Sequence, residues 1–300
     1  MKPKKGYVFL IILAALFWSL DALIRRQLSA IPSSIIVLLE HSISSLVALP
    51  FLKRFIPEYK KMNAKDWLAI AFIGVIGGGL AYVMYTEALG QVNNISYSVV
   101  ALIQQTQPIF TVILATFLLK EKITKKYGLF ALIALISAYF LTFPDLKPNF
   151  LGGREELIAA SLAMGSAIFW GAATTLGKVV LKKISYAALA ILRFLIVVPV
   201  AGLISLVLHQ SYPLSSITSS QWGYLMILSL FSGIISFIIY YKGLEHTQAK
   251  VATFAELTWP VGAAFIGFFF LKESLTVIQV VAALILMFDI LAISLTSQQQ

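Results

Sequence analysis

Residues 96–119 read SYSVVALIQQTQPIFTVILATFLL, and residues 120–126 read KEKITKK. The first stretch has the length of the roughly 20 mostly apolar residues that an α-helix needs to cross about 30 Å of hydrocarbon. Polar residues nevertheless occupy its middle, from Gln104 to Pro108, and a basic segment follows it. This pattern predicts a transmembrane helix that is broken near its centre and ends at a membrane surface.

The same pattern returns 152 residues later, where residues 248–271 read QAKVATFAELTWPVGAAFIGFFFL. The shared offset matches further pairs: Phe17-Trp18 with Phe169-Trp170, Thr106 and Pro108 with Thr258 and Pro260, and Leu119-Lys120-Glu121 with Leu271-Lys272-Glu273. The identity is weak, but the register is kept along the whole half. The chain therefore contains an internal repeat.

The composition supports a membrane protein throughout. Hydrophobic residues make up 59% of the 300 residues and charged residues 12%, whereas soluble domains are about 25% charged. Ten apolar runs are separated by short polar segments. We expect spans near residues 6–29, 33–52, 66–89, 96–119, 125–143, 157–181, 185–208, 221–243, 248–271 and 275–296.

Five spans fall in each half, and an odd number makes equivalent helices cross the membrane in opposite directions. The sequence thus predicts an all-α integral membrane protein of ten transmembrane helices, built as two five-helix inverted-topology repeats. The repeats are residues 1–143 and 157–300, and a Pro/Gly-rich linker, 144–156, joins them. Inverted repeats allow a midplane site to open to either side in turn.

The net charge of +10 does not indicate nucleic-acid binding, because Lys and Arg lie between apolar runs and not on one solvated face. Their distribution instead indicates how the chain is oriented in the membrane. With the N-terminus inside, 17 of the 23 basic residues face the cytoplasm and five, including Arg25 and Arg26, face outward. This split predicts that both termini are cytoplasmic.

These features together resemble the EamA-type permeases of the drug/metabolite transporter superfamily. The resemblance rests on Phe-Trp in the first helix of each half, the mid-span prolines and the Lys-Glu-x-[Ile/Leu]-Thr motif at 120–124 and 272–276. It implies a bacterial cytoplasmic-membrane exporter of amino acids or related metabolites, with a solute cavity between the halves. The resemblance also implies an Arg in the second helix of each half, and the sequence has Arg193 but, at the equivalent position, His41.

Ionisable residues inside a bilayer are costly and therefore have partners, a wet cavity or a function. Arg193 offers a planar fork for a carboxylate or phosphate, but a structural ion pair with Glu256 or Glu40 is an open alternative. Glu256 and its repeat partner Gln104, with Gln107, lie beside the span-breaking prolines. We expect them to line the cavity, the alternative being hydrogen bonds between helices.

Aromatic residues complete the predicted site. Trp18, Trp170, Trp259 and Tyr82 are candidates for stacking on a solute or for covering a cation, although span aromatics also serve as packing or interface anchors. His41 beside Glu40 suggests proton coupling. Because neighbouring helical residues point about 100° apart, a histidine that is merely hydrogen-bonded between helices is equally compatible with the sequence.

The leading hypothesis is a secondary transporter that exports a small solute, an amino acid or related metabolite, by alternating access. The alternative is a cationic drug or metabolite exporter of the same fold. An intramembrane enzyme lacks a clustered nucleophile, base or H-E-x-x-H pair, and a channel fits a pseudo-twofold pair of halves poorly. We expect no catalytic residue, metal or cofactor and no nucleic-acid partner. The remaining partners are membrane lipids and the solute, for a monomer or homodimer.

Overall fold

A computed structural model describes residues 6–91, 95, 97–143, 153–270 and 275–297, and these are helical almost throughout. The first half holds α1 (Tyr7–Trp18), α2 (Asp21–Gln27), α3 (Ser33–Ala48), α4 (Leu52–Tyr59), α5 (Ala64–Ala71), α6 (Ala81–Gly90), α7 (Tyr97–Gln104), α8 (Gln107–Leu118) and α9 (Lys125–Thr142). The second half holds α10 (Arg154–Val180), α11 (Tyr186–Val207), α12 (Ser219–Ile227), α13 (Ser236–His246), α14 (Ala249–Glu256), α15 (Thr258–Phe270) and α16 (Val277–Ser297).

Several crossings consist of two consecutive helices. α1 continues into α2, and α7 and α14 continue into α8 and α15. In the third helix of each half, a π-helical segment joins the two pieces: Phe72–Leu80 lies between α5 and α6, and Leu228–Ile235 lies between α12 and α13. Short 3-10 turns occupy Leu49–Phe51 and Leu214–Ser216.

The predicted fold class is confirmed. Nine of the described helical stretches are long and apolar enough to cross a membrane. The remaining crossing is α14 with α15, which is interrupted at Leu257 so that neither piece of 8 or 13 residues spans alone. Large apolar side chains such as Phe117, which is 75% exposed, cover the outside of the bundle, as expected for a surface that faces lipid.

The predicted helix breaks near Pro108 and Pro260 are also confirmed, since α7 ends at Gln104 and α14 at Glu256. Two boundaries differ from expectation. α10 begins at Arg154, inside the predicted linker, whose residues 144–152 lie outside the described part. The polar segment after the second span contains a further helix, α4, and the second Lys-Glu motif at 272–273 is not described.

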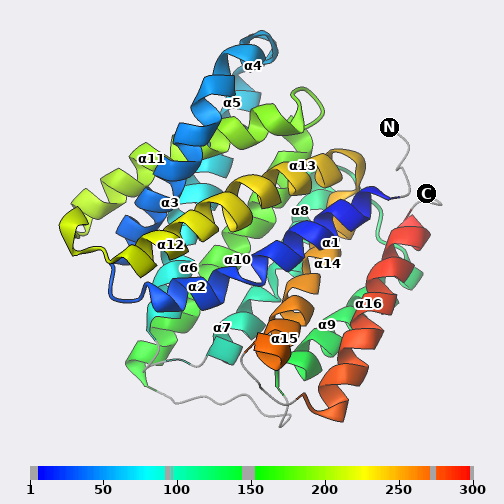
Figure 1. The fold of residues 1–300 in the computed structure, drawn as a ribbon. Helices are drawn as coiled ribbons and strands as arrows, with labels where there is room; N and C mark the ends of the chain where they lie inside the picture. Colours follow the sequence, from blue (N-terminus) through cyan, green and yellow to red (C-terminus); the bar gives the residue numbers. More distant parts are fainter. Residues whose placement is uncertain (1–5, 92–94, 96, 144–152, 271–274, 298–300) are drawn as a thin grey trace.

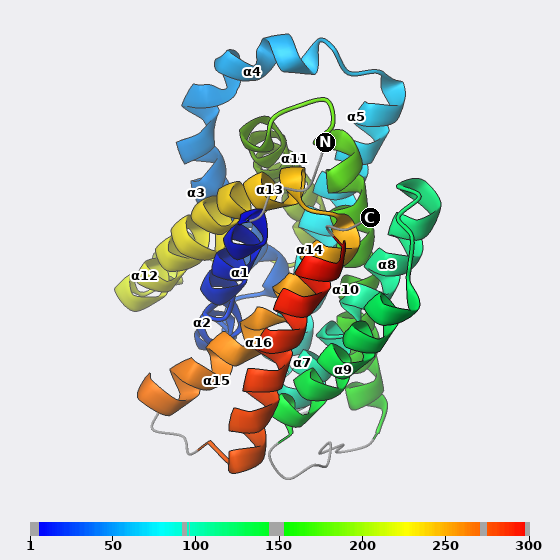
Figure 2. The same cartoon turned by 90° about the vertical axis from the view of Figure 1, so that its right-hand side faces the viewer.

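The two halves interleave rather than sit side by side. α1 packs against α13, α14 and α15 of the second half, and α10 packs against α6, α7 and α8 of the first. The second helices of the halves, α3 and α11, pack on each other, as do the fifth helices, α9 and α16. Figures 1 and 2 show α9 and α16 side by side in both views. Each half therefore lacks a complete core without the other.

Glycine allows the closest of these cross-half approaches. A Cβ built on Gly77 in the first π-helical segment meets the Cβ of Ala173 in α10 at 2.6 Å. Alanine has no rotamer that relieves such a contact, so the backbones themselves have to separate.

We therefore expect Gly77→Ala to lower the free energy of unfolding by about 1–3 kcal/mol through overpacking. Gly128→Ala is the matched control, because a Cβ on this exposed α9 glycine has no neighbour within 4 Å. The measurement is the unfolding temperature of each purified variant in detergent, followed by tryptophan fluorescence. Equal unfolding temperatures for the two variants would show that the α10 contact is not tight.

Candidate functional site

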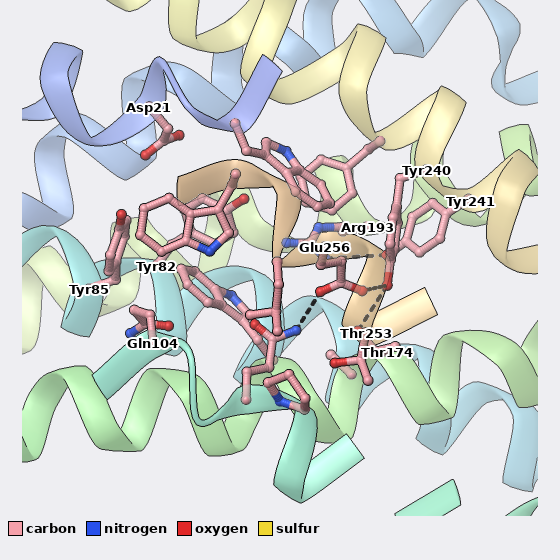
Figure 3. Close-up of a pocket in the computed structure, with 18 residues that line it drawn as sticks. Asp21, Tyr82, Tyr85, Gln104, Thr174, Arg193, Tyr240, Tyr241, Thr253 and Glu256 are labelled. Atoms are coloured by element: carbon pink, nitrogen blue, oxygen red, sulfur yellow. Dashed lines mark hydrogen bonds between the residues drawn. The ribbon is translucent and has the colours of Figure 1, made fainter. Parts of the chain in front are cut away.

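A cavity lies between the interleaved halves, near the helix breaks (Figure 3). Its lining residues come from crossings of both halves, including α1, α6, α11 and α14. All eight residues that the sequence predicted for solute binding line it: Trp18, Tyr82, Gln104, Gln107, Trp170, Arg193, Glu256 and Trp259. The structure thus gathers the predicted set around one space, while their role in binding stays a prediction.

Aromatic rings form two walls of the cavity. On one side the Trp170 ring centre lies 5.1 Å from that of Tyr82 and 5.0 Å from that of Tyr85. On the other side the Trp18 ring centre lies 5.4 Å from that of Phe237 and 5.1 Å from that of Tyr240. Flat, rigid rings of this kind offer large apolar contact at low entropic cost to a planar ligand.

The two predicted tryptophans occupy equivalent positions and make equivalent bonds. The Trp18 indole donates to the carbonyl of Ser232 at 3.0 Å, and the Trp170 indole donates to the carbonyl of Gly77 at 2.9 Å. Both acceptors belong to π-helical segments of the opposite half, where the altered register changes which carbonyls bond within the helix. The crossed bonds fix both indole rings against the cavity.

Arg193 is the most unusual polar group of the site. Its side chain is buried, with 3% of the residue exposed, and its Nη1 donates a hydrogen bond to the hydroxyl of Tyr241 at 3.2 Å. Nε and Nη2 are buried without a partner. The guanidinium lies 3.9 Å from the ring centre of Phe237 and 5.5 Å from that of Tyr82, and such aromatic faces stabilise a cation.

The structural ion pair considered for Arg193 is not present in the described residues. Glu256 instead accepts a hydrogen bond from the Tyr240 hydroxyl at 2.7 Å and one from Gln107 Nε2 at 2.6 Å. Glu40 binds Arg25. Figure 3 shows Arg193, Glu256 and Tyr240 around the same space. Two nitrogen atoms of a permanent cation, Nε and Nη2, therefore lack a hydrogen-bond partner within the described residues.

Gln104, the repeat partner of Glu256, bonds across the halves. Its Nε2 donates to the carbonyl of Ala163 at 2.8 Å and to Ser166 Oγ at 2.5 Å, both on α10. Its Oε1 is buried without a partner. The hydrogen bonds between helices considered for this glutamine are therefore present, and one acceptor remains free beside the cavity.

Sequence reasoning missed a buried charge network at the cavity wall. Arg25, which the charge count placed on the outer side of the membrane, is 1% exposed. Its Nε binds Asp21 Oδ1 at 2.5 Å, its Nη2 binds Glu40 Oε2 at 2.6 Å and its Nη1 donates to Thr86 Oγ1 at 3.0 Å. Asp21 also lines the cavity. The pairing of Arg25 with Asp21, one helical turn earlier, offsets the cost of this burial.

His41 and Glu40, the predicted proton-coupling pair, do not line the cavity. His41 Nδ1 lies 3.0 Å from the carbonyl of Val37, and its ring packs edge-on against Tyr82. Glu40 points to Arg25. This contact lies within α3 and does not join two helices, so the hydrogen bond between helices considered for His41 is not among the described contacts, and proton coupling at this pair stays a prediction.

Three acidic side chains of the first half, Glu58, Asp66 and Glu121, contact the second half. Glu121 accepts from the backbone N–H groups of Ala249 and Lys250 at 2.9 and 3.0 Å, capping α14. Glu58 accepts from Ser185 N at 2.6 Å, capping α11, and Lys183 Nζ binds Asp66 at 2.6 Å. Carboxylates at helix N-termini are stabilising, so these contacts join the two halves.

A multi-pass helical bundle with a cavity between inverted halves defines a membrane transporter. The chain belongs to the EamA-like transporter family, whose model matches residues 5–143 and 157–295. The class and family expected from the repeat are therefore confirmed.

Individual relatives are also described as transporters. The chain is 30% identical over 287 residues to the riboflavin transporter ImpX of Fusobacterium nucleatum, covering 95% of this chain and 96% of that protein. It is 27% identical over 290 residues to the uncharacterized transporter YetK of Bacillus subtilis, covering 91% and 81%. A solved crystal structure aligns over 99% of both chains with a TM-score of 0.77 at 16% identity, which shows the shared fold.

Proposed function

We propose that this protein is a secondary transporter that carries a small, planar metabolite across a bacterial cytoplasmic membrane by alternating access, with both termini in the cytoplasm. The observation that carries the proposal is the Arg193 guanidinium, buried with two free donors in an aromatic-walled cavity. Burying unsatisfied donors is costly, and a bound acceptor or anion removes this cost. The interleaved inverted halves support alternating access.

Riboflavin is the first solute to test. A relative that covers nearly the whole chain is named a riboflavin transporter, and a flat ring system with carbonyl acceptors suits the aromatic walls and the donors of Arg193. An aromatic amino acid is the second candidate. It is favoured by the presence of Arg193 and Glu256 on the same cavity, where they suit the two charged ends of a zwitterion.

A cationic solute fits less well. Of the two carboxylates on the cavity, Asp21 already binds Arg25 and Glu256 already accepts two hydrogen bonds. A cation would also have to approach Arg193. The cavity is therefore better suited to acceptors and anions.

The test is thermal stabilisation of the purified protein by riboflavin, tryptophan and tetraphenylphosphonium. A ligand that binds only the native state stabilises it by about 2.7 kcal/mol at 100 times its Kd. We expect riboflavin to raise the unfolding temperature most and tetraphenylphosphonium not at all. Stabilisation by tetraphenylphosphonium alone would replace the proposal with a cation exporter.

Flux in liposomes then distinguishes a carrier from a channel. We expect uptake of labelled riboflavin into vesicles loaded with unlabelled riboflavin to saturate with concentration, as it does for a site that alternates between sides. A flux that rises linearly without saturation would contradict a carrier. The same vesicles distinguish export, the direction that the family resemblance implies, from uptake.

A further inference from the structure

The carboxylates and guanidinium groups at and directly behind the cavity do not balance. Three carboxylates, Asp21, Glu40 and Glu256, accompany two guanidinium groups, Arg25 and Arg193, and none of these residues is more than 8% exposed. Arg25 binds both Asp21 and Glu40. An uncompensated charge in such surroundings is expensive, and a buried carboxyl group avoids the cost by binding a proton.

Of these three carboxyl groups, Glu256 is the one without an ion pair among the described residues, and its two hydrogen bonds join it to neutral groups. Its Oε1 lies 2.7 Å from the Tyr240 hydroxyl, and its Oε2 lies 2.6 Å from Gln107 Nε2. The Tyr240 hydroxyl lies 2.9 Å from Thr174 Oγ1, and either atom of that pair can donate. A protonated Glu256 can therefore donate to Tyr240 while Tyr240 donates to Thr174, so the same contacts hold the acid and the carboxylate.

We propose that Glu256 binds the proton that couples transport to the proton gradient, an inference that rests on the proposed transporter function. In the neutral state Glu256 leaves Arg193 free to bind the solute. After the proton leaves, the carboxylate attracts Arg193 across the cavity and competes with the solute. Proton and solute therefore favour each other's binding and cross the membrane together, so an inward proton gradient drives uptake rather than the export that the family resemblance implies.

Besides Tyr240, which is hydrogen-bonded to Glu256, other charged or titratable groups surround Glu256 without a hydrogen bond or ion pair to it in the described residues. Those on the cavity are Asp21, Tyr82, Tyr85, Arg193 and Tyr241. On the elements packed against α14, Lys178 of α10 donates to the carbonyls of Leu244 and Glu245, and Asp289 of α16 is buried. Lys250 at the start of α14 donates to the carbonyl of Lys122, and α8 and α15 contain no titratable side chain. Arg193 is therefore the cation lining the cavity whose attraction to Glu256 changes when Glu256 gains or loses its proton.

Infrared titration of the lipid-reconstituted protein tests the proton site with protons alone as the ligand. We expect a carbonyl stretch of a protonated carboxylic acid that disappears as the pH rises and is absent from Glu256→Gln. Asp289→Asn is the matched control, since it removes a buried carboxyl group that does not line the cavity, and should keep the band. Tyr240→Phe retains the ring and should change the pH at which the band titrates. A band unaltered by Glu256→Gln and by Tyr240→Phe would overturn the proposal.

Flux tests the coupling separately. With an inward proton gradient, we expect wild-type vesicles to accumulate riboflavin up to about tenfold per pH unit for one proton per neutral solute, and Glu256→Gln to lose this accumulation. Riboflavin exchange that ignores the gradient, or that runs against it, would overturn coupling while the transporter function stands. If wild-type vesicles exchange no riboflavin, that solute fails, and the infrared titration still decides whether Glu256 holds a proton.

Discussion

Arg193→Met should weaken solute binding by about tenfold to a hundredfold for each hydrogen bond lost, because a bond to a charged group contributes about 1.5–3 kcal/mol. The free energy of unfolding should change by no more than about 1 kcal/mol, because the loss of the Tyr241 hydrogen bond and of the contact with the Phe237 ring is offset by removing a buried cation with unpartnered nitrogens. Methionine keeps much of the side-chain length without the charge.

The measurement is the Kd for riboflavin from its fluorescence, together with the unfolding temperature of each variant. Arg193→Lys is the control that keeps the charge but loses the planar fork, and it should fall between wild type and Arg193→Met. Wild-type affinity in Arg193→Met would show that the free donors of this residue do not face the solute.

Arg25→Met should have the opposite profile, with a loss of about 3–5 kcal/mol in the free energy of unfolding. Its guanidinium binds both Asp21 and Glu40, and its removal leaves two buried carboxyl groups without their cation. The unfolding temperature in detergent measures the loss. The two buried arginines thus serve as controls for each other, one satisfied by the protein and the other open to a ligand.

The triple variant Asp21→Asn, Arg25→Met, Glu40→Gln should recover most of that stability. Replacing a whole buried ion network by neutral groups costs far less than removing one member. If Arg25→Met were as stable as Arg193→Met, the network around Arg25 would carry no structural energy. If the triple variant were as unstable as Arg25→Met, the lost free energy of unfolding would come from packing and not from the unpaired carboxyl groups.

Hydropathy was sufficient to predict the ten crossings, because a helix that spans lipid has to be long enough and apolar enough to cross it. The helix α11 spans Tyr186–Val207 against an expected 185–208, and α9 spans Lys125–Thr142 against 125–143. The π-helical segments were not predicted. They alter the hydrogen-bond register of a helix without altering its apolar character, so composition does not report them.

The cavity residues were predictable for a related reason. Polar groups in the middle of a span, such as Gln104 and Glu256, have to avoid lipid, and the repeat offset places equivalent residues on both sides of one axis. Arg25 escaped prediction because it lies near a span end, where a solvent-facing role is also reasonable. The available signal was Asp21, four residues earlier, which marks a possible ion pair on one helix face.

The crossed indole bonds of Trp18 and Trp170 bear on the energy difference between the two end states of transport. If the halves exchange conformations, each tryptophan moves into the environment that the equivalent tryptophan had before. The protein then still has two indole hydrogen bonds of the kind now made to Ser232 and Gly77. We therefore expect the inward-open and outward-open states to be nearly equal in energy. Their populations would then follow the residues that break the symmetry, Arg193 against His41 and Glu256 against Gln104, and about 1.4 kcal/mol from solute or proton would shift them tenfold.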